Sequence, residues 1–464
     1  MLLRTAGRTT NRLTAFTRLT RGLTSINPPP GPIENLPSAH NGKILKTHFT
    51  DESTTITFIT KDSPGHEPFT VTFNNLFLRD SSRSEKSVDP KSGQKLFTTG
   101  HLVSDPDSTV PKQVEISPDS QSVAINWKDG DHYRYSLDFI YKFKGSTFVT
   151  DALRNTVSKH KPVLWDKKTL KGHMEDLVSV NYDGFMKNEE QLYKALTTLQ
   201  KYGLALINNV PKGNEDAVKD ICERVGPIRN TIYGETFDVK SNITTTSNIA
   251  YSNLALPLHM DLLYMENVPG FQLLHSINNS PDEAGGVNIF VDAFHAARHV
   301  REQDAEGYEA MQHVPVNYQY SKDGHCYYQS RPMIEQYDSN ESNTLMGNYE
   351  YLIKRVYYSP PFQAPFTVGI YEKAPETNTS KGKVTERFLF RDFAHGIGLF
   401  DQFINKAENQ FKIKLPENTC VIFNNTRILH ARTAFKSSDR WLKGCYLDRD
   451  SFKSRLKYLE QKYK

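Results

Sequence analysis

The 464-residue sequence predicts an α+β fold dominated by β-structure, with a small β-rich N-terminal domain ahead of a larger domain. Three observations predict it. Short runs of β-branched and aromatic residues, separated by turn residues, fill positions 42–151. Beyond residue 165, leucines at helical spacing alternate with strand-like runs. The chain is also long enough for two domains, since domains commonly contain about 100 to 200 residues.

Residues 1–30 differ in composition from the rest of the chain. They contain Arg4, Arg8, Arg12, Arg18 and Arg21 and no acidic residue, which predicts a mitochondrial presequence and linker and hence a matrix location. A disordered basic tail is the alternative. Without the five arginines the formal net charge falls from +4 to −1, so composition gives nucleic-acid binding little support. No apolar run approaches the ~18 to 20 residues that a membrane span needs.

The remaining elements follow from periodicity and turn residues. In the N-terminal domain, residues 41–150, strands are expected at 54–60, 69–77, 113–116, 122–127 and 133–137. In the larger domain, residues 165–455, helices are expected at 189–202, 215–225 and 386–410, a strand at 203–209 and a polar insert around 321–348. A lysine-rich helical tail is expected at 450–464.

Two distant segments contain candidate metal ligands. In residues 256–262 (LPLHMDL), His259 and Asp261 are two positions apart, so in an extended strand both side chains point to the same face. Residues 423–432 (FNNTRILHAR) supply His430. Two histidines and one carboxylate form the facial triad of non-haem iron(II) oxygenases. A histidine near an aspartate is also common as an ordinary surface or core pair, which is the alternative.

An arginine follows the second segment and is a candidate for binding an anionic cosubstrate. Arg440 lies ten residues after His430 and could bind a dicarboxylate through a bidentate pair. Arg432 and Arg427 are rival candidates for the same role.

Several motifs together resemble the 2-oxoglutarate oxygenases of the TauD type. They are the histidine and aspartate above and the segments 269–275 (PGFQLLH), 285–286 (GG), 291–294 (VDAF) and 423–430 (FNNTRILH). Within that family, the sequence is most similar to the carnitine-biosynthesis branch of gamma-butyrobetaine hydroxylase and trimethyllysine dioxygenase, and especially to its fungal mitochondrial "altered inheritance of mitochondria" paralogues. The resemblance implies a double-stranded β-helix (jelly-roll) catalytic core with flanking helices.

The resemblance also implies the cofactors. Iron(II) would be held by His259, Asp261 and His430, and Arg440 would bind 2-oxoglutarate. The reaction would consume 2-oxoglutarate and O2, release succinate and CO2, and hydroxylate a small molecule, with ascorbate needed in vitro. Related enzymes suggest a homodimer.

Substrate-binding residues are also carried over from the resemblance. Tyr233, Phe237, Tyr251 and Tyr446 match an aromatic cage for a trimethylammonium group, with plain core packing as the alternative. Asn248 matches a residue that holds the substrate carboxylate. Leu262, however, stands where gamma-butyrobetaine hydroxylase has a tyrosine, and leucine cannot donate a hydrogen bond.

The related hydroxylases carry a zinc site in the N-terminal domain. Here Ser82, Ser84 and Ser87 stand where the resemblance leads us to expect cysteines, and His132 alone remains. Because neutral hydroxyls are poor zinc ligands, we expect no zinc. The four cysteines of the chain are far apart and are expected to be buried thiols.

The sequence therefore predicts a mitochondrial iron(II)- and 2-oxoglutarate-dependent dioxygenase acting on a small, betaine-like substrate. Gamma-butyrobetaine, trimethyllysine and another betaine stay open as substrates. A protein of another class, which keeps the fold without turnover, is the remaining alternative.

Overall fold

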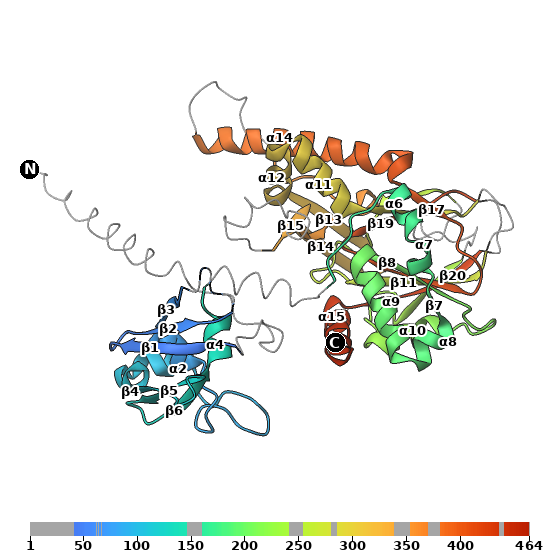
Figure 1. Cartoon of the computed structure of the whole chain (residues 1–464). Coiled ribbons are helices and arrows are strands. Elements are labelled where there is room, and N and C mark those ends of the chain that lie inside the picture. Colours follow the sequence, from blue (N-terminus) through green and yellow to red (C-terminus); the bar gives the residue numbers. More distant parts are fainter. Residues whose placement is uncertain are drawn as a thin grey trace, which may run out of the picture. The chain divides into compact units, whose positions relative to one another are not determined.

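The computed structural model describes the backbone of residues 41–61, 63, 65, 67–145, 160–240, 254–279, 285–337, 353–369, 381–435 and 440–463. The predicted presequence and the candidate residues Asn248 and Tyr251 lie outside these residues. The chain divides into two compact units, residues 1–157 and 158–464 (Figure 1).

The first unit contains two antiparallel sheets of three strands each. One sheet consists of β1 (Lys43–Phe49), β2 (Ser53–Ile59) and β3 (Phe69–Asn74), and the other of β4 (Pro111–Ile116), β5 (Ser122–Trp127) and β6 (His132–Ser136). Three short helices connect them, α2 (Asn75–Asp80), α3 (Thr99–Ser104) and the 3-10 turn η3 (Pro106–Thr109), and α4 (Leu137–Lys142) follows β6. Along β2, Ile56 and Phe58 enter the core while Thr55 and Thr57 face outward, which is the alternation of a half-buried strand.

A polar cluster occupies the positions where the resemblance would place zinc. The hydroxyls of Ser82, Ser84 and Ser87 all donate to the carboxylate of Asp131, at 2.7 Å from Ser82 and 3.2 Å from Ser87. Arg79 lies 3.5 Å from the same carboxylate. The exposed His132 contacts Asn126 instead. The hydroxyls of these serines are poor zinc ligands, so this donor set does not fit the metal.

We expect Asp131→Asn to destabilise the first unit by about 1 to 3 kcal/mol, because an amide removes the charge that the buried Arg79 and the serines face. Thermal or urea unfolding of the variant measures this. Asp107→Asn is the matched control, since its 3.8 Å contact with Lys128 is solvent-exposed and should contribute little. Equal stability of the two variants would contradict a role for the cluster.

Two larger sheets form the second unit. Their strand orders are β7-β8-β18-β11-β20-β9 and β10-β19-β12-β17. The six-stranded sheet contains β7 (Val180–Asn181), β8 (Leu204–Asn208), β9 (Thr236–Lys240), β11 (Phe271–Asn278), β18 (Thr419–Asn424) and β20 (Trp441–Leu447). The four-stranded sheet contains β10 (Leu256–His259), β12 (Asn288–Asp292), β17 (Phe411–Ile413) and β19 (Ile428–Arg432). From β9 to β12 and again from β17 to β20, successive strands alternate between the two sheets, which is the winding of a jelly roll.

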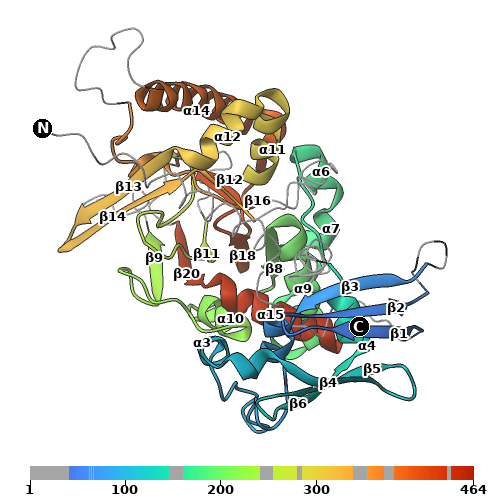
Figure 2. The ribbon, with the colours of Figure 1, turned by 90° about the vertical axis from the view of Figure 1, so that its left-hand side faces the viewer.

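Helices cover this core in two groups (Figures 1 and 2). On the outer face of the six-stranded sheet, apolar residues pack against α9 (Glu189–Tyr202), α10 (Ala217–Val225) and α15 (Arg449–Lys462). The other group contains α11 (Ala293–Gln303), α12 (Ala305–His313) and α14 (Lys381–Asn405). The shorter helices are α6 (Lys167–Gly172), α7 (Met174–Leu177), α8 (Tyr182–Lys187), η6 (Pro360–Phe362) and η7 (Ala407–Asn409).

Helix α9 ends where the sequence predicts, and its end lies against the side chains of Arg427 and Ile428. Asn188 caps the first turn, and Gly203 adopts a left-handed conformation with φ of 71°. A Cβ atom on Gly203 would lie 2.9 Å from Ile428 and 3.1 Å from Arg427. Glycine therefore lets the helix end approach the turn that precedes His430.

Four predictions differ from the structure. The strand expected at 69–77 ends at Asn74, because the Asn74 side chain accepts from the N–H of Leu76 and caps the start of α2. The helix expected at 386–410 is α14, which ends at Asn405, because the side chains of Asn409 and Gln410 bond the carbonyls of Phe403 and Ile404. The expected polar insert contains a hairpin of β13 (Pro315–Lys322) and β14 (His325–Pro332), followed by β15 (Ile334–Gln336), which pairs with β16 (Ile353–Val356). Cys326, in β14, is exposed, whereas the other three cysteines are buried.

The hairpin follows from a signal in the sequence. Asp323 and Gly324 both have positive φ, 52° and 78°, as a two-residue turn of this kind requires.

Among the described residues, no helix combines the length and apolar character needed to cross a bilayer.

Candidate active site

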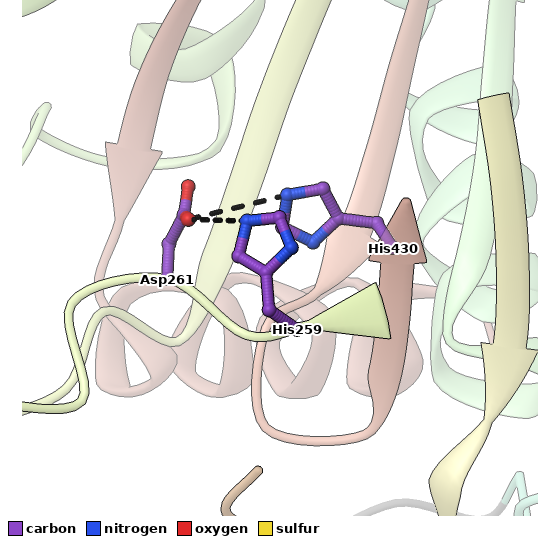
Figure 3. Close-up of side chains that lie close together, drawn as sticks. All are labelled: His259, Asp261 and His430. Carbon is purple, nitrogen blue, oxygen red and sulfur yellow. Dashed lines mark ion pairs between the residues drawn. The ribbon is translucent and has the colours of Figure 1, made fainter. Parts of the chain in front are cut away.

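Strand pairing brings the three candidate ligands together. In the antiparallel pair of β10 and β19, His259 is directly opposite His430, and Asp261 follows two residues beyond (Figure 3). The Nε2 atoms of His259 and His430 lie 3.2 Å and 4.0 Å from Oδ1 of Asp261. Within the described residues, this is the one group of three or more histidine, cysteine or acidic side chains with ligand atoms all within 4.8 Å of one another.

The protonation states of the histidines suit a metal. Nδ1 of His259 lies 2.8 Å from the carbonyl oxygen of Pro257, which favours a proton on Nδ1 and leaves the lone pair of Nε2 directed at the site. Burial, and then the neighbouring His259, lower the pKa of His430 to about 3. The His430 imidazole can therefore offer a lone pair near neutral pH.

Asp261 is held from two directions. The Tyr446 hydroxyl donates to Oδ2 of Asp261 at 2.8 Å, and the Asn425 side chain bonds both the backbone N–H and C=O of Asp261 at 2.9 Å. Burial alone would raise the pKa of Asp261, but the nearness of the His259 and His430 imidazoles outweighs it and leaves that pKa below the usual range. The carboxylate is therefore ionised and available as a ligand.

Two further histidines, one in the 269–275 motif and one directly after the 291–294 motif, lie elsewhere. His275, on β11, is buried, and the strand's alternation turns it away from the pocket-lining residues Gln272 and Leu274. Nδ1 of His295 lies 3.0 Å from the Trp165 carbonyl oxygen. Neither side chain belongs to the ligand group.

A pocket opens beside the three ligands, between the two sheets, with about 810 Å³ of space that is partly open to solvent. Residues of the six-stranded sheet line one wall of the pocket, and residues of the four-stranded sheet line the other. The polar side chains that line it, besides the three ligands and three tyrosines, are Gln272, Asn288, Arg432 and Arg440.

Arg440 has the features of an anion-binding residue. Its side chain is buried, no carboxylate of the described residues pairs with it, and its contact with Asn288 Oδ1 is 3.5 Å long. Burial, and then Arg432, lower the pKa of Arg440 to about 9, which reflects the cost of a buried charge without a counter-ion. Gly286, with φ of 67°, makes room, because a Cβ there would lie 3.1 Å from Arg440 Nε.

The rival candidates have different surroundings. Arg432 also lines the pocket and donates to the carbonyl of Leu254 at 2.9 Å. Arg427 is excluded from a ligand role, because it forms a buried ion pair with Asp292 at 2.7 Å. Its remaining N–H groups bond the carbonyls of Lys201 and Val163.

The predicted aromatic residues that the structure describes meet at the pocket. The rings of Tyr233 and Phe237 are 6.3 Å apart, and those of Phe237 and Tyr446 stack at 5.0 Å. Sequence reasoning missed Tyr264, whose hydroxyl lies 3.4 Å from that of Tyr233, and Phe362, whose ring contacts Tyr264. The residue next to Asp261, Leu262, also lines the pocket and supplies no hydrogen-bond donor.

A jelly-roll fold with two histidines and one carboxylate beside its pocket is typical of non-haem iron oxygenases. The chain belongs to the TauD/TfdA family, because residues 167–446 match the family described as "Taurine catabolism dioxygenase TauD, TfdA family". Members of this family are iron(II)- and 2-oxoglutarate-dependent dioxygenases, which confirms the predicted enzyme class and cofactors.

Curated relatives extend over most of the chain. It is 48% identical to the "Probable oxidoreductase AIM17" of Saccharomyces cerevisiae, over 92% of this chain and 93% of that protein. It is 28% identical to the mitochondrial trimethyllysine dioxygenase of Rattus norvegicus, over 82% of this chain and 80% of that one. With the gamma-butyrobetaine dioxygenase of Pseudomonas sp. (strain AK-1), it shares 27% identity over 84% of this chain and 91% of that one.

Proposed function

We propose that this protein hydroxylates a small quaternary-ammonium substrate, with iron(II) held by His259, Asp261 and His430 and 2-oxoglutarate held by Arg440. The observation that carries the proposal is the clustering of three ligand atoms beside a pocket that also contains a buried, uncompensated guanidinium.

The side chains of His259, Asp261 and His430 fit iron(II) in the arrangement that the structure shows. Two lone pairs and one carboxylate oxygen converge, and a set of three protein ligands leaves positions open for other molecules. When bound, iron(II) would supply the activation of O2 that is coupled to decarboxylation of 2-oxoglutarate. The protein contributes binding and orientation: Arg440 directs the anionic cosubstrate, and the aromatic side chains shape the space for the second substrate.

Arg440→Ala is expected to weaken 2-oxoglutarate binding roughly 10- to 100-fold, because a charged hydrogen bond contributes about 1.5 to 3 kcal/mol. Arg440→Lys should recover part of the loss, since lysine keeps the charge but lacks the planar fork. Calorimetric titration of the metal-loaded protein measures both. Arg455→Ala, which removes a pair with Glu189, is the control. Unchanged binding in Arg440→Ala would reassign the anion site to Arg432.

The pocket lining supports a cationic substrate whose charge is not paired with a carboxylate of the protein. Among the described residues that line it, Asp261 is the sole acidic side chain, and it is committed to the ligand group. A quaternary ammonium group can instead be held over the faces of Tyr233, Phe237, Tyr264 and Tyr446 by cation–π attraction. Because Leu262 stands where gamma-butyrobetaine hydroxylase has a tyrosine and offers no donor, gamma-butyrobetaine itself is disfavoured as the substrate.

Succinate formation tests the function. The purified chain would receive iron(II), ascorbate and 2-oxoglutarate together with gamma-butyrobetaine, trimethyllysine or other betaines in turn. We expect one compound to stimulate succinate release and to gain a hydroxyl group by mass spectrometry. If uncharged isosteres with a tert-butyl group stimulate equally, the ammonium specificity is wrong. If iron(II) and 2-oxoglutarate do not bind, the non-catalytic alternative replaces the enzyme.

We further propose a mitochondrial location. The arginine-rich, acid-free residues 1–30 support it, as does the mitochondrial relative from rat. A fluorescent fusion of the full chain should enter mitochondria, and the same fusion without residues 1–30 should not.

A further inference from the structure

The two oxygens of Asp261 face different partners. Both ion-pair lines in Figure 3 leave the same oxygen, Oδ1, toward the Nε2 atoms of His259 and His430. The other oxygen, Oδ2, accepts the hydroxyl hydrogen of Tyr446 at 2.8 Å. One oxygen is thus directed at the ligand group, while the other is occupied by a tyrosine.

Tyr446 is fixed by contacts that do not involve Asp261. It lies in the interior of β20, where its register partner is Gln272 of β11, and its carbonyl accepts from the N–H of Arg229 at 2.8 Å. Its side chain is buried, and its ring stacks on Phe237. The position of the hydroxyl is therefore set by the sheet, and the carboxylate adjusts to it.

The backbone of Asp261 has little freedom of its own. The buried Asn425 bonds its N–H and C=O and also reaches the Pro269 carbonyl at 3.2 Å. The next residue, Leu262, is buried in a left-handed conformation with φ of 60°, which is unusual for a bulky side chain. With the main chain held, rotation of the carboxylate is the freedom that remains, and the Tyr446 hydrogen bond restricts it.

We propose that Tyr446 is a positioning residue that keeps Asp261 a one-oxygen metal ligand, in addition to forming part of the pocket wall. This inference depends on the proposed function. A carboxylate can bind a metal through one oxygen or two. If Oδ2 were free to turn toward the ion, it would take one of the positions that 2-oxoglutarate and O2 need. Hydrogen bonds to ligating carboxylates commonly change metal affinity or activity 10- to 100-fold.

Tyr446→Phe tests the inference, because it removes the hydroxyl and keeps the ring that stacks on Phe237. Tyr135→Phe is the matched control: it also loses a buried hydroxyl bond, to the Leu78 carbonyl at 2.6 Å, but in the first unit. Cobalt(II) is a suitable probe, since its visible absorbance responds to the number of ligand atoms. Each variant would be titrated with cobalt(II) and then, metal-loaded, with 2-oxoglutarate, and its metal-free unfolding curve would confirm folding.

We expect Tyr446→Phe to change the cobalt absorbance and to bind 2-oxoglutarate roughly 10- to 100-fold more weakly, with Tyr135→Phe matching the wild-type protein. Wild-type absorbance and affinity in a folded Tyr446→Phe variant would overturn the positioning role and leave the proposed function intact. If Tyr446→Phe did not fold, the infrared difference spectrum between cobalt-loaded and metal-free wild-type protein should show the carboxylate stretches of one-oxygen coordination, and the stretches of two-oxygen coordination would overturn the inference. Failure of the wild-type protein itself to bind cobalt(II) would instead overturn the proposed function.

Discussion

His430→Ala is expected to lower substrate-stimulated succinate formation at least about 1,000-fold, which corresponds to about 4 kcal/mol of transition-state free energy. The imidazole of His430 is buried and neutral, and it shares one carboxylate oxygen with His259. Two remaining ligands would hold iron(II) poorly, so the same variant should lose most of its metal by elemental analysis.

His313→Ala is the control for this experiment. Its imidazole is exposed and contacts the carbonyl of Glu309 on its own helix, so neither iron content nor turnover should change. Wild-type turnover in His430→Ala would remove His430 from the ligand set and would require another third ligand.

Arg427→Met is expected to destabilise the second unit by about 3 to 5 kcal/mol, because it leaves the charge of Asp292 buried and uncompensated. Both side chains are buried, and Asp292 also accepts hydrogen bonds from the N–H groups of Trp165 and Phe294. Urea unfolding measures the change. Since Arg427 lies three residues before His430, iron binding should weaken as well.

A double-mutant cycle separates the ion pair from simple loss of packing. Asp292→Asn keeps an acceptor for the helix N-terminus while removing the charge. The double variant, with Arg427→Met, should therefore be less destabilised than the sum of the single changes. Strict additivity would show that the two side chains are not coupled.

The ligand group could be predicted from sequence because its residues lie in short, recognisable segments. The spacing of His259 and Asp261 lies within one short segment, although β10 ends at His259 and Asp261 lies in the turn that follows, and the third ligand followed from the family motif. Helix α9 was predictable for the same reason, since leucine spacing, a cap and a terminal glycine all lie within one segment.

Other features depend on partners far apart in the chain. Arg427 and Asp292 are separated by 135 positions, so sequence could not show that this arginine is already paired. Tyr446 and Asp261 are 185 positions apart, and a shared motif marked the tyrosine as an aromatic wall without revealing its hydrogen bond. Tyr264 was overlooked although it follows Asp261 by three residues, because the left-handed Leu262 changes the direction of the chain.

The serine cluster of the first unit has a consequence for cellular stress. A thiolate site for zinc can be emptied by chelators or oxidised by peroxide, whereas serine hydroxyls undergo neither change. Here the segment containing Ser82, Ser84 and Ser87 is anchored by hydrogen bonds to Asp131, and Arg79 donates a further one to Ser87 at 2.9 Å. An iron enzyme that consumes oxygen can generate damaging oxidants, and this anchor is inert to them. Folding of the first unit should thus be independent of both zinc supply and redox conditions.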